Sequence, residues 1–280
     1  MNKKTAPILL SFLFFMRLTV FGQSLDSITV VSKDWNVTPI KKGVTWKQAH
    51  FDKLFESKQE INLVEIDLKK YRRKIHIAAD SRELKKTSQF AMEAEALVAI
   101  NGGFFDMKSG GSWDYIKVNN KVINTTKKKA DRSNAILLID KKAIKIQSDS
   151  AIDYEQSNVP NILLSGPLLI HQEQNATLSD NPFNNNRHPR SAVAITTDQK
   201  LIFIVVDGRN SLAAGMNLTE LTKTLRWLGA EDAMNLDGGG SSTLYVKDAT
   251  ENSIVNHPCD NKKFDHEGQR SVANIIYLKE

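Results

Sequence analysis

Short apolar stretches that end in glycine-rich polar turns recur along this chain. The stretch 233–236 leads into Asp237 and three consecutive glycines, and the run 96–100 leads into Asn101-Gly102-Gly103. Short apolar runs of this kind are typical of strands that are buried on both faces. The sequence therefore predicts two buried strands, each ending in a polar side chain at a glycine turn.

Apolar periodicity predicts several further elements. Strands are expected at 61–68, 75–79, 96–100, 161–170 with a break at Ser-Gly-Pro, 191–196, 201–206 and 271–277, and a hairpin at 134–140 with 143–146. One helix is predicted from a leucine stripe at Leu218, Leu221, Leu225 and Leu228. Asn217 and Glu220 have the spacing of a capping box at its start, and Gly229 suits its end.

The N-terminal part has weaker patterns. Thr29 to Val31 is compatible with a short strand, and 46–55 has weak helical spacing. We interpret residues 24–60 as an N-terminal extension packed on a main domain that spans 61–280. The polar stretch 172–186 is expected to form a long surface loop, and residues 108–114 a loop that could cover a site.

These elements together favour one fold class. Strands outnumber helices, and the connections are a mixture of hairpins and longer crossovers. We predict an α+β fold of mixed β-sheets with flanking helices, in which strand ends converge on one polar cleft.

Length and charge narrow the class of protein. The chain has 280 residues, is 41% hydrophobic and carries a formal net charge of +6. Residues 1–23 combine Lys3 and Lys4 with an apolar run from Ala6 to Met16, which is typical of a signal peptide and too short to span a membrane. Its removal leaves 35 basic and 32 acidic residues, a net charge of +3. This modest excess gives no reason to expect a nucleic-acid partner.

The export signal predicts a periplasmic or extracellular protein with no integral membrane segment after processing. Cys259 is the only cysteine, so a disulfide framework is excluded. We interpret Cys259 as a passive loop thiol, because no sequence feature marks it as a nucleophile or metal ligand.

The stretch from Asp237 to Thr243 is the strongest candidate for chemistry. Glycine is tolerated where a backbone needs an unusual conformation or where a ligand must approach the main chain closely. The N–H groups of Gly238, Gly239 and Gly240 could form an anion-binding nest, with Ser241 and Ser242 adding donors. The alternative is a tight turn that Asp237 merely caps.

Five blocks in this chain resemble the phosphodiester glycosidase family. They occur in the family order and cover 61–280. The blocks are Asn101-Gly102-Gly103-Phe104-Phe105, Arg190 with 192–195, Asp207-Gly208-Arg209 with the helix that follows it, 235–243, and Arg270-Ser271-Val272-Ala273-Asn274. The resemblance implies hydrolysis of a sugar 1-phosphodiester, such as an N-acetylglucosamine 1-phosphodiester, with a glycosyl-phosphate or phosphorylated glycan as the substrate.

The residues in these blocks suit that chemistry. Paired carboxylates are the usual apparatus of glycoside hydrolysis, so Asp237 and Asp207 are the candidate catalytic acids, and Asn101 would orient the substrate. Phosphate is already a fair leaving group, so one carboxylate could suffice. The candidate substrate-binding groups are Arg190, Arg209, Arg270, Gly238, Gly239, Gly240, Ser241 and Ser242, because guanidinium binds phosphate oxygens with two-pronged geometry.

Several alternatives stay open. Asp207-Gly208 is also an ordinary turn pair, and Arg209 could form a structural ion pair with Asp207. Ser241 as a nucleophile needs a base, and the sequence places neither His257 nor His266 beside it. A divalent cation could bind among Asp207, Asp237 and Asn101, although no spacing matches a metal signature, so no metal site is predicted.

The overall activity also has alternatives. Cleavage on the other side of phosphorus would make the protein a phosphodiesterase. A domain that kept the cleft without turnover would be a binding module for anionic polysaccharide. The product that carries the phosphate distinguishes a glycosidase from a phosphodiesterase. Saturable ligand binding without any product would identify the binding module.

Overall fold

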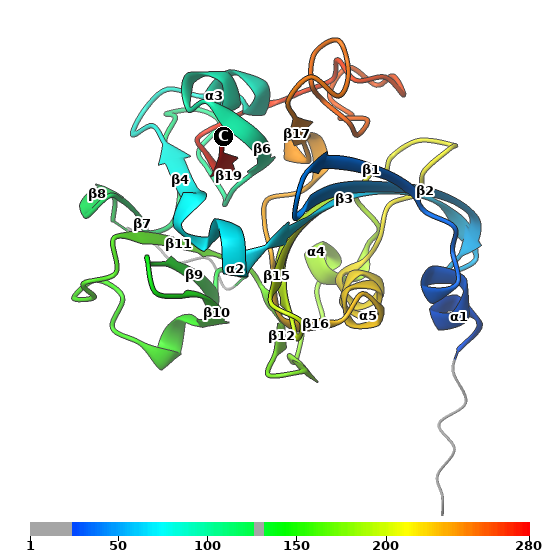
Figure 1. Cartoon of the computed structure of the whole chain (residues 1–280), viewed down its shortest axis with the longest axis horizontal. Coiled ribbons are helices and arrows are strands. Elements are labelled where there is room, and N and C mark those ends of the chain that lie inside the picture. Colours follow the sequence, from blue (N-terminus) through cyan, green and yellow to red (C-terminus); the bar gives the residue numbers. More distant parts are fainter. Residues whose placement is uncertain (1–23, 126–131) are drawn as a thin grey trace, which may run out of the picture.

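The computed structural model describes residues 24–125 and 132–280, and the expected signal peptide 1–23 lies outside them. A large sheet organises the described part of the chain (Figure 1). Its strands, in spatial order, are β1 (Asn36–Lys41), β2 (Val44–Leu54), β3 (Ser57–Asp67), β15 (Lys200–Val206), β14 (Arg190–Thr196), β16 (Ala230–Asn235), β12 (Leu168–His171) and β13 (Gln174–Asn175). Each neighbouring pair is antiparallel.

Smaller sheets complete the strand arrangement. A five-stranded sheet contains β10 (Ile144–Ser148), β9 (Ala135–Ile139), β11 (Asn161–Ser165), β7 (Ile116–Val118) and β8 (Lys121–Asn124). A four-stranded sheet contains β17 (Leu244–Val246), β6 (Ala96–Asn101), β19 (Asn274–Lys279) and β4 (Ile75–Ala79), and a two-stranded ribbon pairs β18 (Ser271–Val272) with β5 (Lys85–Lys86). The predicted α+β class is confirmed, with a predominance of strand.

The helices are short. They are α1 (Leu25–Val31), α2 (Leu68–Tyr71), α3 (Thr87–Glu93), α4 (Pro182–Asn185) and α5 (Leu218–Trp227), with 3₁₀ turns η1 (Arg72–Lys74), η2 (Asp149–Ala151) and η3 (Gly239–Ser241). Helix α5 begins with the predicted capping box, since Asn217 and Glu220 each bond the other's backbone N–H. In the described part of the chain, no helix has both the length and the apolar character needed to cross a bilayer.

Two apolar cores lie on opposite faces of the large sheet. Leu201, Phe203 and Val205 of β15 face the smaller sheets, whereas Ile202 and Ile204 face α5. Figure 1 shows α4 and α5 on one side of the sheet and strands β4, β6 and β9 on the other. Because both faces of β15 are buried, its sequence is continuously apolar, as the pattern predicted.

The N-terminal segment differs from the sequence expectations. The strand expected at Thr29 to Val31 is wrong, because this segment lies in α1, where Ser24 accepts a bond from the Ser27 N–H. The helix suggested by the spacing at 46–55 is also wrong, because β2 occupies this segment and pairs with β3. Cross-strand burial of Ala49 and Phe51 outweighs the weak helical pattern. Strand β3 crosses position 61, so residues on both sides of the expected domain boundary share one sheet.

Candidate functional site

The two predicted strand-end turns lie against each other although they belong to different sheets. The Asp237 N–H donates to the Gly102 carbonyl at 3.0 Å, and Asn101 Nδ2 donates to the Asp237 carbonyl at 2.7 Å. Strand β6 belongs to the four-stranded sheet and β16 to the large sheet. Sheet packing therefore joins two motifs that are more than 130 residues apart.

Asn101 holds these turns together from inside the protein. Its side chain is fully buried, and Oδ1 accepts from Ser191 Oγ at 2.7 Å and from the Thr243 N–H at 3.2 Å. Since Nδ2 is bonded to the Asp237 carbonyl, the amide contacts protein groups on both sides. This placement makes Asn101 a positioning residue for the turns rather than a group exposed to substrate.

Each glycine of the triplet is required for a different reason. A Cβ at Gly238 would press on the Pro189 carbonyl at 2.7 Å. Gly239 has a φ of +64°, which L side chains rarely adopt. A Cβ at Gly240 would overlap the Asp260 carboxylate. The triplet therefore lets the segments of Pro189 and Asp260 approach this backbone closely and lets the chain turn at Gly239.

The N–H groups of this turn are largely used within the protein. Gly238 N–H donates to Asp237 Oδ1 at 3.0 Å, Gly239 N–H to the Pro189 carbonyl at 2.8 Å, and Ser242 N–H to the Gly239 carbonyl at 3.2 Å. Ser241 Oγ donates to Asp237 Oδ2 at 2.7 Å. The turn thus orients the Asp237 carboxylate, and the arrangement gives little support to the predicted anion nest.

Asp237 is partly exposed, and its environment perturbs its ionisation. Burial raises the pKa of the carboxyl above its ordinary value. The hydrogen bonds from Ser241 and Gly238, and the charges of Arg270 and Arg132, oppose that shift. A carboxyl with a raised pKa beside two cations is suited to proton transfer.

Asp237 lies on the wall of a pocket of about 460 Å³. Arg132, Arg270 and Lys108 supply positive charge to this pocket, and Phe104 supplies an apolar surface. We call it the Asp237 pocket. It combines three cations with two carboxylates, Asp237 and Asp106, and the excess of positive charge suits a negatively charged ligand.

Arg132 is a pocket residue that the sequence analysis missed. Its guanidinium lies over the ring of Phe104 at 4.3 Å and over the ring of Phe183 at 5.1 Å, measured to the ring centroids. Cation–π contacts of this kind hold a guanidinium in place while its N–H groups stay free to bind an anion. Arg132 belongs to no recognisable motif, so only the fold identifies it.

Arg270 is joined to an acid that the sequence analysis also missed. Its Nε and Nη2 donate to the two oxygens of Asp260 at 2.8 and 2.7 Å, a bidentate pair. Hydrogen bonding to Asp260 raises the Arg270 pKa. Asp260 approaches through the space left by Gly240 and fixes Arg270 at the Asp237 pocket.

Asp207 occupies a different environment from the one expected. It is 1% exposed, and its oxygens accept bonds from Asn256 Nδ2 at 2.9 Å and from the His257 N–H at 3.0 Å. His257 Nδ1 lies 2.9 Å from Asp207 Oδ2, and the imidazole stacks on Phe264 and His266. Asp207 is absent from the residues that line the Asp237 pocket. The geometry therefore gives no support to the predicted pair of Asp207 and Asp237 flanking one bond.

Arg190 is also an internal residue. It is 1% exposed and donates to the carbonyls of Met216 at 2.9 Å, Phe183 at 2.6 Å and Asn186 at 2.9 Å. Burial lowers its pKa to about 10. These contacts fix the segment before β14, whose Pro189 carbonyl supports the glycine turn.

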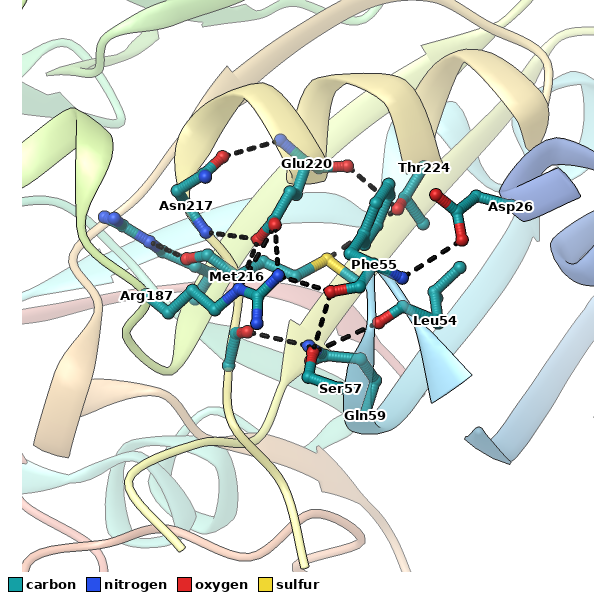
Figure 2. Close-up of polar contacts among 12 residues, drawn as sticks. Asp26, Leu54, Phe55, Ser57, Gln59, Arg187, Met216, Asn217, Glu220 and Thr224 are labelled. Carbon is teal, nitrogen blue, oxygen red and sulfur yellow. Dashed lines mark hydrogen bonds and ion pairs between the residues drawn. The ribbon is translucent and has the colours of Figure 1, made fainter. Parts of the chain in front are cut away.

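A second arginine anchors the same segment (Figure 2). Arg187 Nε lies 3.0 Å from Glu220 Oε2, and its Nη2 also contacts the Phe55 carbonyl. Glu220 at the same time accepts from the Asn217 N–H at 3.0 Å. The predicted capping box of α5 therefore also ties the Arg187–Arg190 segment to the β2–β3 turn.

Arg209 lies against the glycine turn. Its backbone φ is +62°, and its guanidinium lies 3.0 Å from a Cβ built at Gly239. Its Nη1 is 3.9 Å from Cys259 Sγ, and among the described residues it forms no ion pair, so the alternative of a structural bridge to Asp207 is not supported. Arg209 is exposed, but it is absent from the residues that line the Asp237 pocket.

The three candidate metal ligands considered from sequence, Asp207, Asp237 and Asn101, do not converge on one point. Asn101 Oδ1 already accepts two hydrogen bonds, and Asp207 is enclosed by Asn256 and His257. Within residues 24–125 and 132–280, no group of three His, Cys, Asp or Glu side chains has the geometry to hold a metal ion.

Known proteins share this sequence pattern and fold. A family model described as phosphodiester glycosidase matches residues 94–279. N-acetylglucosamine-1-phosphodiester alpha-N-acetylglucosaminidase from Mus musculus is 26% identical over 207 residues, and the Homo sapiens enzyme is 25% identical over 217 residues. These alignments cover 68% and 71% of this chain but 39% and 41% of the enzymes, so the chain spans about two fifths of their length.

Solved structures extend the similarity in fold. The catalytic domain of the zebrafish N-acetylglucosamine-1-phosphodiester alpha-N-acetylglucosaminidase, described as auto-inhibited by its pro-peptide, superposes with a TM-score of 0.68 at 20% identity, covering 87% of this chain and 84% of that one. A hypothetical protein from Synechocystis gives a TM-score of 0.64 at 16% identity, covering 88% and 63%. At these identities the two structures support the fold alone.

Proposed function

Since the chain belongs to the phosphodiester glycosidase family, we propose that it is an exported hydrolase that cleaves a sugar 1-phosphodiester at the glycosidic bond. An N-acetylglucosamine 1-phosphodiester is the first substrate to test, because the curated relatives are named for it. The observation that carries the proposal is the Asp237 pocket, where one carboxylate with a raised pKa lies beside Arg132 and Arg270.

The arginines account for recognition of the phosphodiester. Arg132 is held by aromatic rings and Arg270 by Asp260, so both guanidinium groups are ordered before a ligand arrives. Preorganised cations bind an anion without a further ordering cost, and a guanidinium can contact two phosphate oxygens at once.

Asp237 accounts for the chemical step. We assign it as the base that takes a proton from a water molecule attacking the anomeric carbon. The bond between that carbon and the phosphate oxygen breaks, its electron pair stays on the oxygen, and the phosphomonoester leaves beside the arginines. Because the leaving group is already acidic, no second carboxylate is required in the pocket.

The decisive experiment is product analysis with purified protein. The protein is incubated with N-acetylglucosamine 1-(methyl phosphate) and other sugar 1-phosphodiesters, and products are identified by ³¹P NMR and mass spectrometry. We expect free sugar and methyl phosphate from the wild type, and strongly reduced release from Asp237→Asn. Phosphate retained on the sugar would instead identify a phosphodiesterase. Saturable binding without product would identify a binding module.

Export is tested separately. Residues 1–23 have the composition of a signal peptide, so expression of the full chain in a bacterial host is expected to give a processed protein outside the cytoplasm. N-terminal sequencing should then place the new terminus near Gln23. Retention of an unprocessed chain in the cytoplasm would contradict this part of the proposal.

A further inference from the structure

Positive charge is concentrated in three segments that meet on one face of the protein. They are Lys41-Lys42 at the β1–β2 turn, the run 69–74 over α2 and η1, and Lys141-Lys142 at the β9–β10 turn. They contain nine of the 35 basic residues that follow position 23, and we call them the basic face. The other 26 basic residues are outnumbered by 32 acidic residues, so the excess of positive charge of the chain lies in these segments.

Hydrogen bonds and a shared apolar base bring the three segments together. Helix α2 and η1 connect β3 of the large sheet to β4 of the four-stranded sheet (Figure 1). Tyr71 Oη donates to the Lys42 carbonyl at 3.1 Å, and Arg72 Nε donates to the Lys141 carbonyl at 3.2 Å. Tyr71 and Ile139 pack in the same apolar core beneath these contacts. The lysines of all three segments are exposed, so their charges project from one surface.

Most bases of this surface lack an acidic partner. Lys70 Nζ lies 3.2 Å from Asp67 Oδ2, and this is the only ion pair that the basic face forms among the described residues. Lys74 Nζ donates to the Glu280 carbonyl at 2.8 Å. Like charges held close together repel one another, and a bound polyanion relieves that repulsion. The basic face is therefore suited to a partner with many negative charges.

A small hollow lies within the basic face. Its volume is about 200 Å³, and we call it the Arg72 pocket. Three cations line it together with three asparagines: Arg72, Arg73, Lys141, Asn119, Asn120 and Asn161. Pockets that enclose a whole small ligand usually measure about 300–1,000 Å³. The Arg72 pocket is smaller, so it fits one charged group of a longer chain.

The other polar groups of the Arg72 pocket leave its net charge positive. Asp140 contributes one carboxylate against the three cations, and its Oδ1 accepts from the Lys142 N–H at 2.6 Å. Burial and the charge of Lys279 lower the pKa of His76, so the imidazole is uncharged at neutral pH. Cations beside amide and imidazole groups suit a carboxylate or phosphate that is carried on a hydroxyl-rich chain.

The Arg72 pocket and the Asp237 pocket are separate sites. They share no lining residue. Turn η1 leads into β4 at Ile75, which pairs with Leu278 near the end of β19. Asn274 at the start of β19 accepts from the Gly103 N–H, next to the turn that bonds Asp237. A strand rises about 3.3 Å per residue, so Asn274 and Leu278 are roughly 13 Å apart. The basic face thus lies at the other end of the four-stranded sheet.

We propose that the basic face binds an anionic glycan, a polymer of sugars with repeated carboxylate or phosphate groups, and that one such group enters the Arg72 pocket. Membrane-surface sites combine cations with exposed apolar side chains, and the three segments, all of them described, carry no exposed large apolar residue. Unpaired nucleic-acid bases stack on exposed aromatic rings, whereas Tyr71, the aromatic residue of these segments, is half-buried. Binding at this face does not depend on the proposed function.

The first experiment measures binding of defined polymers by isothermal titration calorimetry. The probes are polygalacturonate, which carries carboxylates, phosphomannan, which carries phosphates, and neutral dextran. We expect saturable binding of at least one anionic glycan at low salt, weaker binding at higher salt because salt screens exposed charges, and no binding of dextran. Failure of both anionic glycans to bind at low salt, or equal binding of dextran, would overturn the proposal.

The second experiment removes one exposed lysine from each segment, in the triple variant Lys42→Gln, Lys69→Gln and Lys142→Gln. Three weakened surface contacts should raise the Kd for the glycan by about tenfold. The matched control removes the same charge from three exposed lysines outside the basic face, in Lys53→Gln, Lys58→Gln and Lys223→Gln. The control should bind like the wild type. Equal weakening in the two triple variants would show that net charge alone governs binding and would overturn the proposal.

The Arg72 pocket is tested with two neighbouring lysines. Lys141 and Lys142 are both exposed, but only Lys141 lines the pocket. Lys141→Glu and Lys142→Glu make the same change in charge. Lys141→Glu should weaken glycan binding several-fold more, because it places a carboxylate where the anionic group enters. Equal losses in these two variants would contradict entry into the pocket.

Competitors decide the class of partner. Vesicles of phosphatidylcholine and phosphatidylglycerol, and a short DNA duplex, are titrated under the same conditions. Tighter binding of either competitor than of both anionic glycans would overturn the assignment to a glycan. Each of these measurements follows binding rather than turnover. A protein that hydrolyses sugar 1-phosphodiesters but binds no anionic glycan would leave the proposed function standing, and the reverse result would leave the glycan site standing.

Discussion

Asp237 and Asp207 follow two strands of the same sheet, β16 and β15, which flank β14, yet they lie in opposite kinds of environment. Asp207 is enclosed by donors from Asn256 and His257 and is 1% exposed. Asp237 accepts two local bonds and remains partly exposed on a pocket that contains Arg132 and Arg270. A carboxylate whose oxygens are all occupied stabilises the fold, whereas one that faces a cationic pocket is available for reaction.

The largest effect is expected for the available carboxylate. Asp237→Asn should reduce kcat on a sugar 1-phosphodiester by about 10³-fold, because loss of a general base typically costs 10²- to 10⁴-fold. The asparagine amide can still accept from the Gly238 N–H and donate to Ser241, so folding should be retained. Steady-state kinetics and circular dichroism check both parts. A variant with more than a tenth of wild-type activity would remove Asp237 from the mechanism.

The enclosed carboxylate should respond in the opposite way. Asp207→Ala leaves the His257 N–H and one of the two N–H donors of Asn256 Nδ2 without an acceptor, and we expect a loss of about 3 kcal/mol in the free energy of unfolding. Urea denaturation measures this loss. Activity per folded molecule should stay within tenfold of wild type. Normal stability combined with an activity loss as large as that of Asp237→Asn would show that the two acids have been assigned to the wrong classes.

Arg132 tests whether the cations of the Asp237 pocket bind the phosphodiester. Arg132→Ala should raise KM by about 10- to 100-fold, the range expected for one or two charge-assisted hydrogen bonds. Arg73, an exposed arginine that does not line this pocket, provides the control as Arg73→Ala. Equal kinetics in the two variants would argue against a phosphate contact at Arg132.

The smallest effect concerns pH and stability. Burial raises the pKa of Asp237 above its ordinary value of 3.8, so between these two pKa values the folded state binds more protons than the unfolded state. This residue's contribution to stability is therefore greatest below pH 3.8 and declines as pH rises through the folded-state pKa. Asp237→Asn should remove that decline. Urea denaturation at several pH values gives the free energy of unfolding of the wild type and of Asp237→Asn as a function of pH. Parallel curves for these two proteins would contradict the raised pKa.

Much of the local structure could be predicted from sequence. The leucine stripe and the Asn217–Glu220 capping box defined α5, because both signals depend only on residues within one helix. The hairpin of β14 and β15 followed from two apolar runs around a short polar turn. Short-range patterns failed for 46–55, where β2 is stabilised by pairing with β3 rather than by its own periodicity.

The sequence also identified Asp237 and the glycine turn as the candidate centre. It did so because three consecutive glycines are costly unless a backbone is closely approached, and the contacts of Gly238, Gly239 and Gly240 fulfil that condition. The sequence could not distinguish the role of Asp207 from that of Asp237, because both have the same local signature of an acid at the end of an apolar strand.

Only the tertiary structure decided which groups face the pocket. Arg132 and Trp113 reach it from separate loops, Asp260 holds Arg270 beside it from a third, and none of the three carries a motif of its own. Arg190, which lies in a family block, is instead enclosed by main-chain carbonyls. Local sequence determines where a strand or helix forms, because those signals act over a few residues. Exposure and charge at a site depend on how distant segments pack, and that information is not contained in any single stretch of the chain.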